Sequence, residues 1–161
     1  MAVEIERKFL LADESWRDAI ARSTRMVQGY LGGERCSTRV RIEGERAFLN
    51  VKSRELGVRR SEYEFEIPRS DAEAMLAEFC AERVEKVRHE VVHAGRTFEV
   101  DEFLGANAGL VVAELELSHE HEAFERPAWL GREVTSERRY YNIALAQEPY
   151  GRWGEGDARA C

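Results

Sequence analysis

The chain has 161 residues, of which 43% are hydrophobic and 34% are charged, and its formal net charge is −7. This length suits one domain with its own core. The negative charge argues against nucleic acid as a partner, and no apolar run is long enough to span a membrane. Without a secretion signal at the N-terminus, we expect a cytoplasmic protein. Its three cysteines, Cys36, Cys80 and Cys161, should then be reduced.

Segments in which apolar and charged residues alternate follow one another along the chain, and each is expected to be a β-strand. They are residues 3–10, 25–31, 35–43, 46–53, 59–67, 83–93, 96–104 and 110–118. Short turns near Gly44 and Gly95 should join two pairs of them as antiparallel hairpins.

Four helices are expected, most of them beginning near a polar residue that can cap the first turn. They are residues 14–22 after Asp13, a segment opened by a capping box of Ser70 and Glu73, a short acidic stretch near 119–125, and residues 137–147 after Ser136. Because strands dominate, the expected fold class is α+β. We expect residues 1–148 to form one domain and residues 149–161 a C-terminal tail.

The charged residues of each predicted strand fall at alternate positions and therefore share one face. Like charges are grouped within a strand, as in Glu4 with Glu6 and Arg39 with Arg41. Such grouping is unfavourable unless opposite charges lie across from it on the neighbouring strands. One interpretation is an ordinary antiparallel sheet with an apolar inner face and a charged face in solvent.

The other interpretation is a closed barrel, because about eight antiparallel strands are enough to enclose one small ligand. With the charged face inward, basic strands would bind an anion and acidic strands would bind cations that touch the same anion. The apolar face would point outward and the helices would cover it. Neighbouring positive charges would lower the pKa of the carboxyl groups and keep them ionised.

A series of short motifs runs through nearly the whole chain, from Val3 to about Ala146. The motifs are Glu4-Ile-Glu6-Arg-Lys8, Gln28-Gly29-Tyr30-Leu31, Arg39-Val-Arg41, Val51-Lys52, Glu62-Tyr-Glu64, Lys86-Val-Arg88, Glu114-Leu-Glu116, Glu133-Val134-Thr135 and Arg139-Tyr140-x-Asn142. In their order and spacing they resemble the CYTH family, within the triphosphate tunnel metalloenzymes, whose ExExK signature the first motif matches. The resemblance implies an eight-stranded antiparallel closed β-barrel with a charged lumen and helices packed outside.

The resemblance also implies roles for the charged positions. An acidic set would bind Mg²⁺ or Mn²⁺, which prefer oxygen ligands; it consists of Glu4, Glu6, Glu62, Glu64, Asp101, Glu114 and Glu116. A basic set would bind the phosphates; it consists of Lys8, Arg39, Arg41, Lys52, Arg60, Lys86, Arg88, Arg138 and Arg139. Lys8 and Tyr30 would be catalytic, with Tyr30 as a proton acceptor or gate. The sequence does not decide whether Arg138 or Arg139 faces the tunnel, and Tyr140 and Tyr141 are expected to be packing residues.

The function that the resemblance implies is metal-dependent hydrolysis of inorganic triphosphate to pyrophosphate and phosphate. The resemblance also allows a class IV adenylate cyclase, a thiamine or nucleoside triphosphatase, or a non-catalytic module that binds polyphosphate. The sequence shows no motif for holding a base or activating a ribose hydroxyl, which favours the inorganic substrate. The presence of all six glutamates favours an enzyme over a binding module. The expected partner is a small triphosphate-bearing substrate, and exposed strand faces could allow a homodimer.

Overall fold

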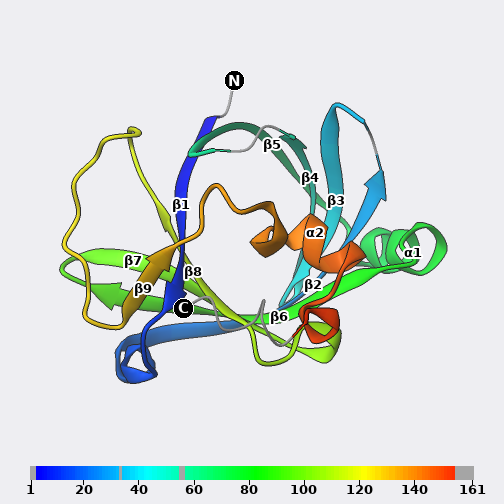
Figure 1. The fold of residues 1–161 in the computed structure, drawn as a ribbon. Coiled ribbons are helices and arrows are strands. Elements are labelled where there is room, and N and C mark those ends of the chain that lie inside the picture. Colours follow the sequence, from blue (N-terminus) through cyan, green and yellow to red (C-terminus); the bar gives the residue numbers. More distant parts are fainter. Residues whose placement is uncertain (1–2, 33, 55–56, 155–161) are drawn as a thin grey trace.

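The structure is a computed structural model that describes residues 3–32, 34–54 and 57–154. Within these ranges the chain forms nine strands (Figure 1). They are β1 (Val3–Leu11), β2 (Ile20–Gly32), β3 (Cys36–Glu43), β4 (Arg46–Ser53), β5 (Arg59–Ile67), β6 (Arg83–His93), β7 (Arg96–Phe103), β8 (Val111–Glu116) and β9 (Leu130–Glu133). Eight of them confirm the predicted strands with small shifts at their ends, except that β2 begins five residues early.

The sheet closes on itself into a barrel. Its strand order is β5-β4-β3-β2-β6-β7-β8-β1-β9, and an additional pairing of β5 with β1 joins the two sides. Every pairing is antiparallel. Strands β1 to β8 thus form the closed eight-stranded barrel of an α+β fold, and β9 pairs with the C-terminal part of β1 at Phe9 and Leu11. This confirms the predicted fold class and the barrel interpretation over the open sheet.

The register explains how charges of like sign can be grouped within one strand. Directly opposite positions on neighbouring strands include Lys8 with Glu114, Glu4 with Arg60, and Lys52 with Glu62. At these positions an opposite charge lies across the strand pair and compensates the repulsion along the strand.

Apolar side chains cover the outside and one end of the barrel, in three clusters. The first lies under the 3₁₀ turn η1 (Ser15–Ala19) and around Trp129, and it contains Phe9, Trp16, Val91 and Phe98. The second lies between the barrel end and helix α2 (Asn142–Gln147). The third lies under helix α1 (Arg69–Phe79), which packs against β2, β3 and β4. The barrel therefore has its apolar side outward, as the tunnel interpretation requires.

Gly29 allows α1 to lie close to the barrel wall. A Cβ atom at this position would lie 2.6 Å from Cys80 Cβ and 2.8 Å from Leu76 Cδ2, which is far inside van der Waals contact. Leu76 belongs to α1 and Cys80 directly follows the helix. The glycine of the Gln28-Gly29-Tyr30 motif therefore serves helix packing.

Three of the predicted helices differ from the structure, for local reasons. Residues 14–22 form only η1, because Trp16 is buried against the ring of His89 and the chain pairs with β6 from Ile20 onward. Residues 119–125 form a turn and irregular chain, because Glu122 caps that turn through Ser118 and pairs with Arg96.

The last helix is broken in two. Its first part is the 3₁₀ turn η3 (Arg138–Tyr140) and its second part is α2, with extended backbone at Tyr141 between them (φ −77°, ψ 142°). The predicted helix after Ser70 is present as α1, but its N-cap is Pro68, and Glu73 pairs with Arg69 instead of closing a capping box.

Short turns complete the described chain, namely η2 (Gly105–Asn107) and η4 (Tyr150–Arg152). The start of the predicted tail packs on the barrel end, where the ring of Trp153 lies 5.4 Å from that of Tyr140. The division into a domain and a tail stays a prediction, and most of the tail lies outside the described residues, together with Cys161. Cys36 and Cys80 are free thiols. Among the described residues, no helix has both the length and the apolar character to cross a membrane.

Candidate active site

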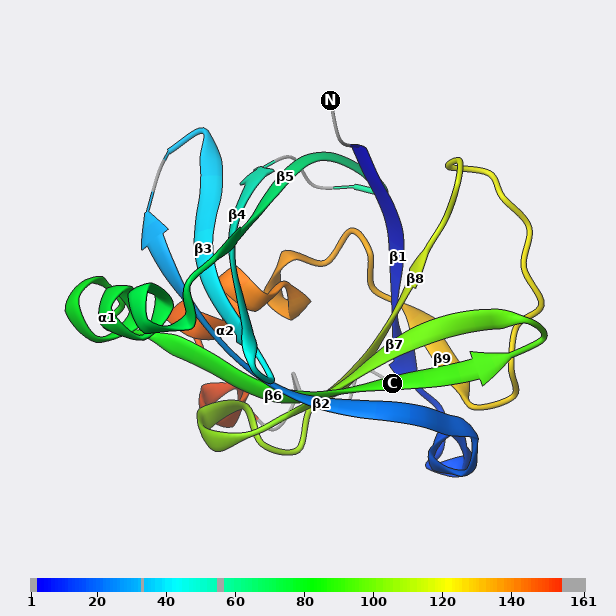
Figure 2. The ribbon, with the colours of Figure 1, turned by 180° about the vertical axis from the view of Figure 1, so that it is seen from behind.

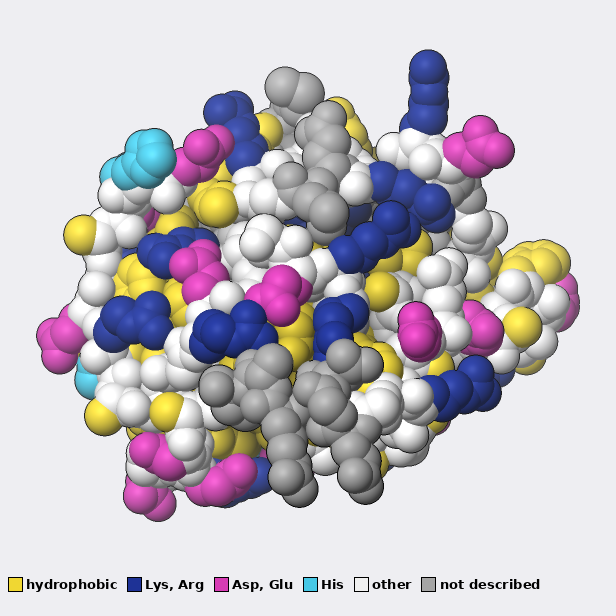
Figure 3. Space-filling view, viewed as in Figure 1, with side chains coloured by type: hydrophobic (Ala, Val, Ile, Leu, Met, Phe, Trp, Pro, Cys, Tyr) yellow, Lys and Arg dark blue, Asp and Glu magenta, His cyan; other side chains and the backbone are white. Residues whose placement is uncertain are grey.

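The barrel encloses one large cavity of about 680 Å³. All eight barrel strands contribute side chains to its wall, and the η3–α2 segment contributes Arg138, Tyr141, Asn142 and Ile143. Figure 1 shows this segment, in orange, crossing one end of the barrel, and Figure 2 shows it from behind through the barrel. Lys and Arg side chains are grouped near the centre of the face that the segment crosses (Figure 3).

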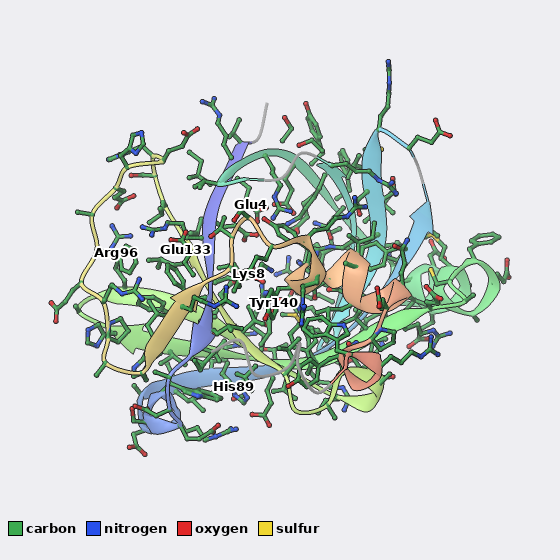
Figure 4. All side chains as sticks on the ribbon, viewed as in Figure 1. Glu4, Lys8, His89, Arg96, Glu133 and Tyr140 are labelled. Atoms are coloured by element: carbon green, nitrogen blue, oxygen red, sulfur yellow. The ribbon has the colours of Figure 1, made fainter. Side chains whose placement is uncertain are left out.

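Most of the predicted site residues line this cavity. They are Glu4, Glu6, Lys8, Tyr30, Arg39, Arg41, Lys52, Arg60, Glu62, Glu64, Lys86, Arg88, Glu114, Glu116 and Arg138. Figure 4 shows Glu4 and Lys8 on the inner side of β1, with Glu133 and Arg96 on its other side. The alternation of charges along the sequence therefore predicted which side chains share the lumen.

Two predicted residues do not line the cavity. Arg139 stacks on the ring of Trp153, with Cζ 3.8 Å from the ring centroid, so Arg138 is the arginine of this pair that faces the tunnel. Asp101 is fully buried behind the wall, where its oxygens accept hydrogen bonds from Lys86 and Arg88. A buried carboxylate whose oxygens are both occupied by cations is better suited to holding those cations than to binding a metal.

The deepest ion pairs join β1 to its neighbours. Lys8 Nζ donates to Glu114 Oε1 at 3.1 Å, and Arg60 Nη2 donates to Glu6 Oε1 at 2.5 Å. All four side chains are largely buried, with exposed side-chain fractions of 3% to 11%. Removing either partner of the Lys8–Glu114 pair would leave the other charge buried without compensation, which is strongly destabilising.

A second group of pairs joins β3, β4 and β5 to one another and to the start of β1. Lys52 Nζ lies 2.8 Å from Glu4 Oε2 and 3.4 Å from Glu62 Oε1. Arg41 Nη2 lies 3.1 Å from Glu64 Oε2. The amide of Asn50, which is buried, donates to both Glu62 and Glu64. Ion pairs and hydrogen bonds therefore join the lumen side chains of β3, β4 and β5 to one another and to β1.

The carboxyl groups of the network do not all behave alike. Burial alone would raise the pKa of Glu114, but Lys8 and then Arg88 lower it well below its ordinary value. For Glu6 the balance is reversed: burial, and then the charges of Glu114 and Glu4, raise its pKa to about 8. Glu4 and Asp101 have lowered pKa values like Glu114, whereas Glu62 and Glu99 have raised ones. The expected lowering of the carboxyl pKa by neighbouring cations is thus found for Glu4, Asp101 and Glu114 and not for Glu6, Glu62 and Glu99.

Burial also shifts the pKa values of one lysine and one tyrosine in the lumen. Burial lowers the pKa of Lys86 to about 8, although Asp101 acts in the opposite direction. Burial raises the pKa of the Tyr30 hydroxyl, which accepts a hydrogen bond from Gln28 Nε2 at 2.9 Å. Because Gln28 occupies a lone pair of this oxygen, the hydroxyl proton of Tyr30 is available to a group in the lumen.

A model of the CYTH domain matches residues 2–147. The chain belongs to the CYTH domain family. An inorganic triphosphatase of Acetivibrio thermocellus is 41% identical over 157 residues, which cover 96% of this chain and 100% of that protein. An inorganic triphosphatase of Nitrosomonas europaea is 38% identical over 148 residues, which cover 89% of this chain and 96% of that protein.

The barrel is similar to those of solved CYTH structures. The crystal structure of the inorganic triphosphatase NE1496 superposes with a TM-score of 0.67 at 36% identity, covering 91% of this chain and 95% of that one. CYTH triphosphatases are in general metal-dependent.

The CYTH lumen of this chain fits a divalent cation in its donors and in its charges. Glu6 lies directly across from Glu116, and Glu99 lies directly across from Glu114. Like charges at opposite positions destabilise a sheet, and a divalent cation between such carboxylates would remove their repulsion. Because the carboxylates also pair with Lys and Arg, the described residues hold no group of three acidic, His or Cys side chains already arranged around a metal.

Sequence reasoning missed several residues of the CYTH lumen. Glu90 and Glu99 line it, and both were visible as charged residues in phase with Lys86 and Asp101 on their strands. Tyr141 and Asn142 line it as well. No periodicity could indicate those two, because they enter from the break between η3 and α2, and Tyr141 was expected to be a packing residue.

Proposed function

We propose that this protein hydrolyses inorganic triphosphate to pyrophosphate and phosphate inside the barrel, with Mg²⁺ or Mn²⁺ as cofactor. The observation that carries the proposal is the enclosed lumen in which lysines and arginines from most strands face glutamates from the same strands. A compact polyanion held with a metal ion matches this arrangement of charges. The inorganic triphosphatases named above, which align over most of the chain, support the same substrate.

The basic residues would bind and orient the substrate. Lys8, Arg60 and Lys52 lie on adjacent strands and would hold phosphate oxygens on one side of the lumen. Arg39 and Arg41 on β3 and Arg88 on β6 would hold them on the other. Cations that are fixed by buried partners stabilise the charge that shifts to the leaving group without having to reorganise during the reaction.

The acidic residues would bind the metal. Glu4, Glu6, Glu62, Glu64, Glu114 and Glu116 supply only oxygen ligands, which Mg²⁺ and Mn²⁺ prefer. When bound, the cation would neutralise phosphate charge and lower the pKa of a coordinated water. In the reaction a water oxygen attacks a terminal phosphorus, the bridging P–O bond on that phosphorus breaks with its electron pair on the pyrophosphate oxygen, and the proton lost by the water passes to a product oxygen or to solvent. The Tyr30 hydroxyl would donate a hydrogen bond to a phosphate oxygen and keep its proton, so we propose Tyr30 as a hydrogen-bond donor in place of the proton acceptor or gate expected from the sequence.

A substrate panel tests the proposal. Purified protein would be assayed with inorganic triphosphate, pyrophosphate, ATP and thiamine triphosphate, each in Mg²⁺, Mn²⁺ or EDTA, with phosphate release and cyclic AMP both measured. We expect the highest kcat/KM for inorganic triphosphate and no turnover in EDTA. Higher kcat/KM for ATP or thiamine triphosphate, or formation of cyclic AMP, would contradict the substrate.

A matched pair of variants ties the activity to the lumen. Arg88→Met removes a buried lumen cation, whereas Arg25→Met removes a cation on the outer side of the wall, where Arg25 pairs with Glu85 and is 56% exposed. We expect Arg88→Met to lose at least about 100-fold in kcat/KM, since one charge-stabilising donor is worth roughly that much. Arg25→Met should stay near the wild-type value. Equal activity of the two variants would place the reaction elsewhere.

A further inference from the structure

The junction between η3 and α2 reaches three cations of the lumen with two consecutive side chains. The ring centroid of Tyr141 lies 4.8 Å from Lys8 Nζ and 5.0 Å from Arg60 Cζ. Asn142 Oδ1 accepts a hydrogen bond from Lys86 Nζ at 3.0 Å. Both side chains line the cavity. We call this pair of residues the end clip.

We propose that the end clip positions Lys8, Arg60 and Lys86 for the phosphates of the substrate. This inference rests on the proposed function, because it assigns the three cations to phosphate binding. Tyr141 and Asn142 act through the cations, so they are positioning residues and not catalytic ones.

Lys8 and Arg60 need an uncharged partner such as Tyr141 because their other partners are glutamates. Lys8 pairs with Glu114 and Arg60 pairs with Glu6, and both glutamates belong to the set proposed to bind the metal. A carboxylate that binds a divalent cation compensates a nearby lysine or arginine less well. The negative face of an aromatic ring attracts cations by its quadrupole, and it is not a ligand for Mg²⁺ or Mn²⁺. Tyr141 therefore remains a partner of Lys8 and Arg60 when Glu114 and Glu6 bind a metal ion.

The Tyr141 ring is held in place by hydrogen bonds that connect it to β1. The Tyr141 hydroxyl donates to the carbonyl oxygen of Thr135 at 2.5 Å, and Thr135 Oγ1 accepts a hydrogen bond from the backbone N–H of Lys8 at 3.0 Å. Thr135 thus links Tyr141 to β1. The backbone is extended at Tyr141, between the two helical turns, and its side chain lines the cavity there.

The test replaces Tyr141 by phenylalanine and by pentafluorophenylalanine, which have similar shapes but opposite ring quadrupoles. Affinity for inorganic triphosphate would be measured by titration calorimetry in EDTA, and kcat/KM in Mg²⁺. We expect the fluorinated variant to bind triphosphate about 10-fold more weakly than the phenylalanine variant, with a similar loss in kcat/KM. Phenylalanine and pentafluorophenylalanine variants with equal affinities would overturn the proposal.

Two controls exclude a general loss of structure. Tyr140→Leu removes the neighbouring ring, which packs on Trp153 and not on a lumen cation, and it should bind triphosphate as the wild type does. Asn142→Gln keeps a neutral amide oxygen for Lys86 and should retain more affinity than Asn142→Ala, which should lose several-fold. If Tyr140→Leu weakens binding as much as the fluorinated ring, or if Asn142→Ala binds like the wild type, the end clip has no positioning role.

The binding series also separates this inference from the proposed function. A wild-type protein that binds triphosphate in EDTA but never hydrolyses it would contradict the proposed function. The affinities of the phenylalanine and pentafluorophenylalanine variants would still test the role of the end clip. A wild-type protein that does not bind triphosphate would overturn both.

Discussion

Asp101 holds Arg88 by two parallel hydrogen bonds, from Nε to Oδ1 at 2.7 Å and from Nη2 to Oδ2 at 2.8 Å. Lys86 Nζ donates to the same Oδ2 at 2.7 Å. The carboxylate is wholly buried, while both cations line the cavity. We infer that Asp101 fixes the direction of two phosphate-binding side chains from behind the wall.

Asp101→Asn should therefore destabilise the protein strongly. Lys86 and Arg88 would lose a buried counter-charge, which costs about 3–5 kcal/mol in the free energy of unfolding, measured by urea denaturation. Glu99→Gln is the matched control, because Glu99 also pairs with Arg88 but its side chain is 45% exposed, so the cost should be below about 1 kcal/mol. If Asp101→Asn were as stable as wild type and only required more metal for activity, Asp101 would be a metal ligand after all.

The two adjacent arginines of η3 should give opposite results when replaced by methionine. Arg138 lines the cavity, so Arg138→Met should lower kcat/KM for triphosphate about 10-fold or more while leaving the free energy of unfolding nearly unchanged. Arg139 stacks on Trp153, so Arg139→Met should cost about 1 kcal/mol of stability and little activity. Steady-state kinetics and urea denaturation of both variants check this, and the reverse pattern would mean that Arg139 is the lumen residue.

The raised pKa of Glu6 predicts a pH dependence of stability in the metal-free protein. Between about pH 4.5 and 8 the folded protein keeps a proton on Glu6 that the unfolded chain has released. The free energy of unfolding should therefore fall as the pH rises through this window. Below about pH 4.5 the sign reverses, because Glu114 and Asp101 have lowered pKa values and take up protons on unfolding.

Glu6→Gln checks this assignment, because glutamine keeps an oxygen for Arg60 but cannot titrate. Urea denaturation in EDTA across the same window should show a flatter pH dependence for the variant than for the wild type. A variant that loses stability with pH as steeply as the wild type would show that another group is responsible.

Gly29→Ala should destabilise the protein by about 1–3 kcal/mol, as expected for overpacking. The added methyl group would overlap Cys80 and Leu76, so α1 would have to move away from β2. Thermal denaturation measures the effect, and Gly95→Ala serves as a contrast, because no atom lies within 4 Å of a Cβ there, although its positive φ of 74° adds strain of a different kind. An unchanged melting temperature in Gly29→Ala would mean that the helix is not held against the wall.

The alternation of charges could be read because a strand places every second side chain on one face. When the sheet closes into a barrel, the charged faces of all strands become the wall of the lumen. The alternation therefore placed Glu4, Glu6 and Lys8 correctly in this wall. The short strand β9 was missed, since four residues with Gly131 among them carry too little alternation to stand out.

The remaining errors come from contacts between distant parts of the chain. Asp13 looked like a helix cap, but Trp16 is buried against β6 and the chain becomes extended at Ile20. Tyr141 was expected to be a packing residue, but its place depends on Thr135 and on Lys8 and Arg60, which come from two different strands. Local propensity cannot report such contacts, because tertiary packing decides them.

The strand β1 is paired on both sides, with β5 and with β8, and β9 also lies along it. The nine residues of β1 are synthesised early, but their pairing partners extend as far along the chain as Glu133. Pairings between residues so distant in sequence form slowly. The same strand carries Glu4, Glu6 and Lys8, so docking of the N-terminus completes the fold and the chemistry in a single event. A chain in which β1 is not yet paired therefore lacks both the closed barrel and three charged side chains of the lumen.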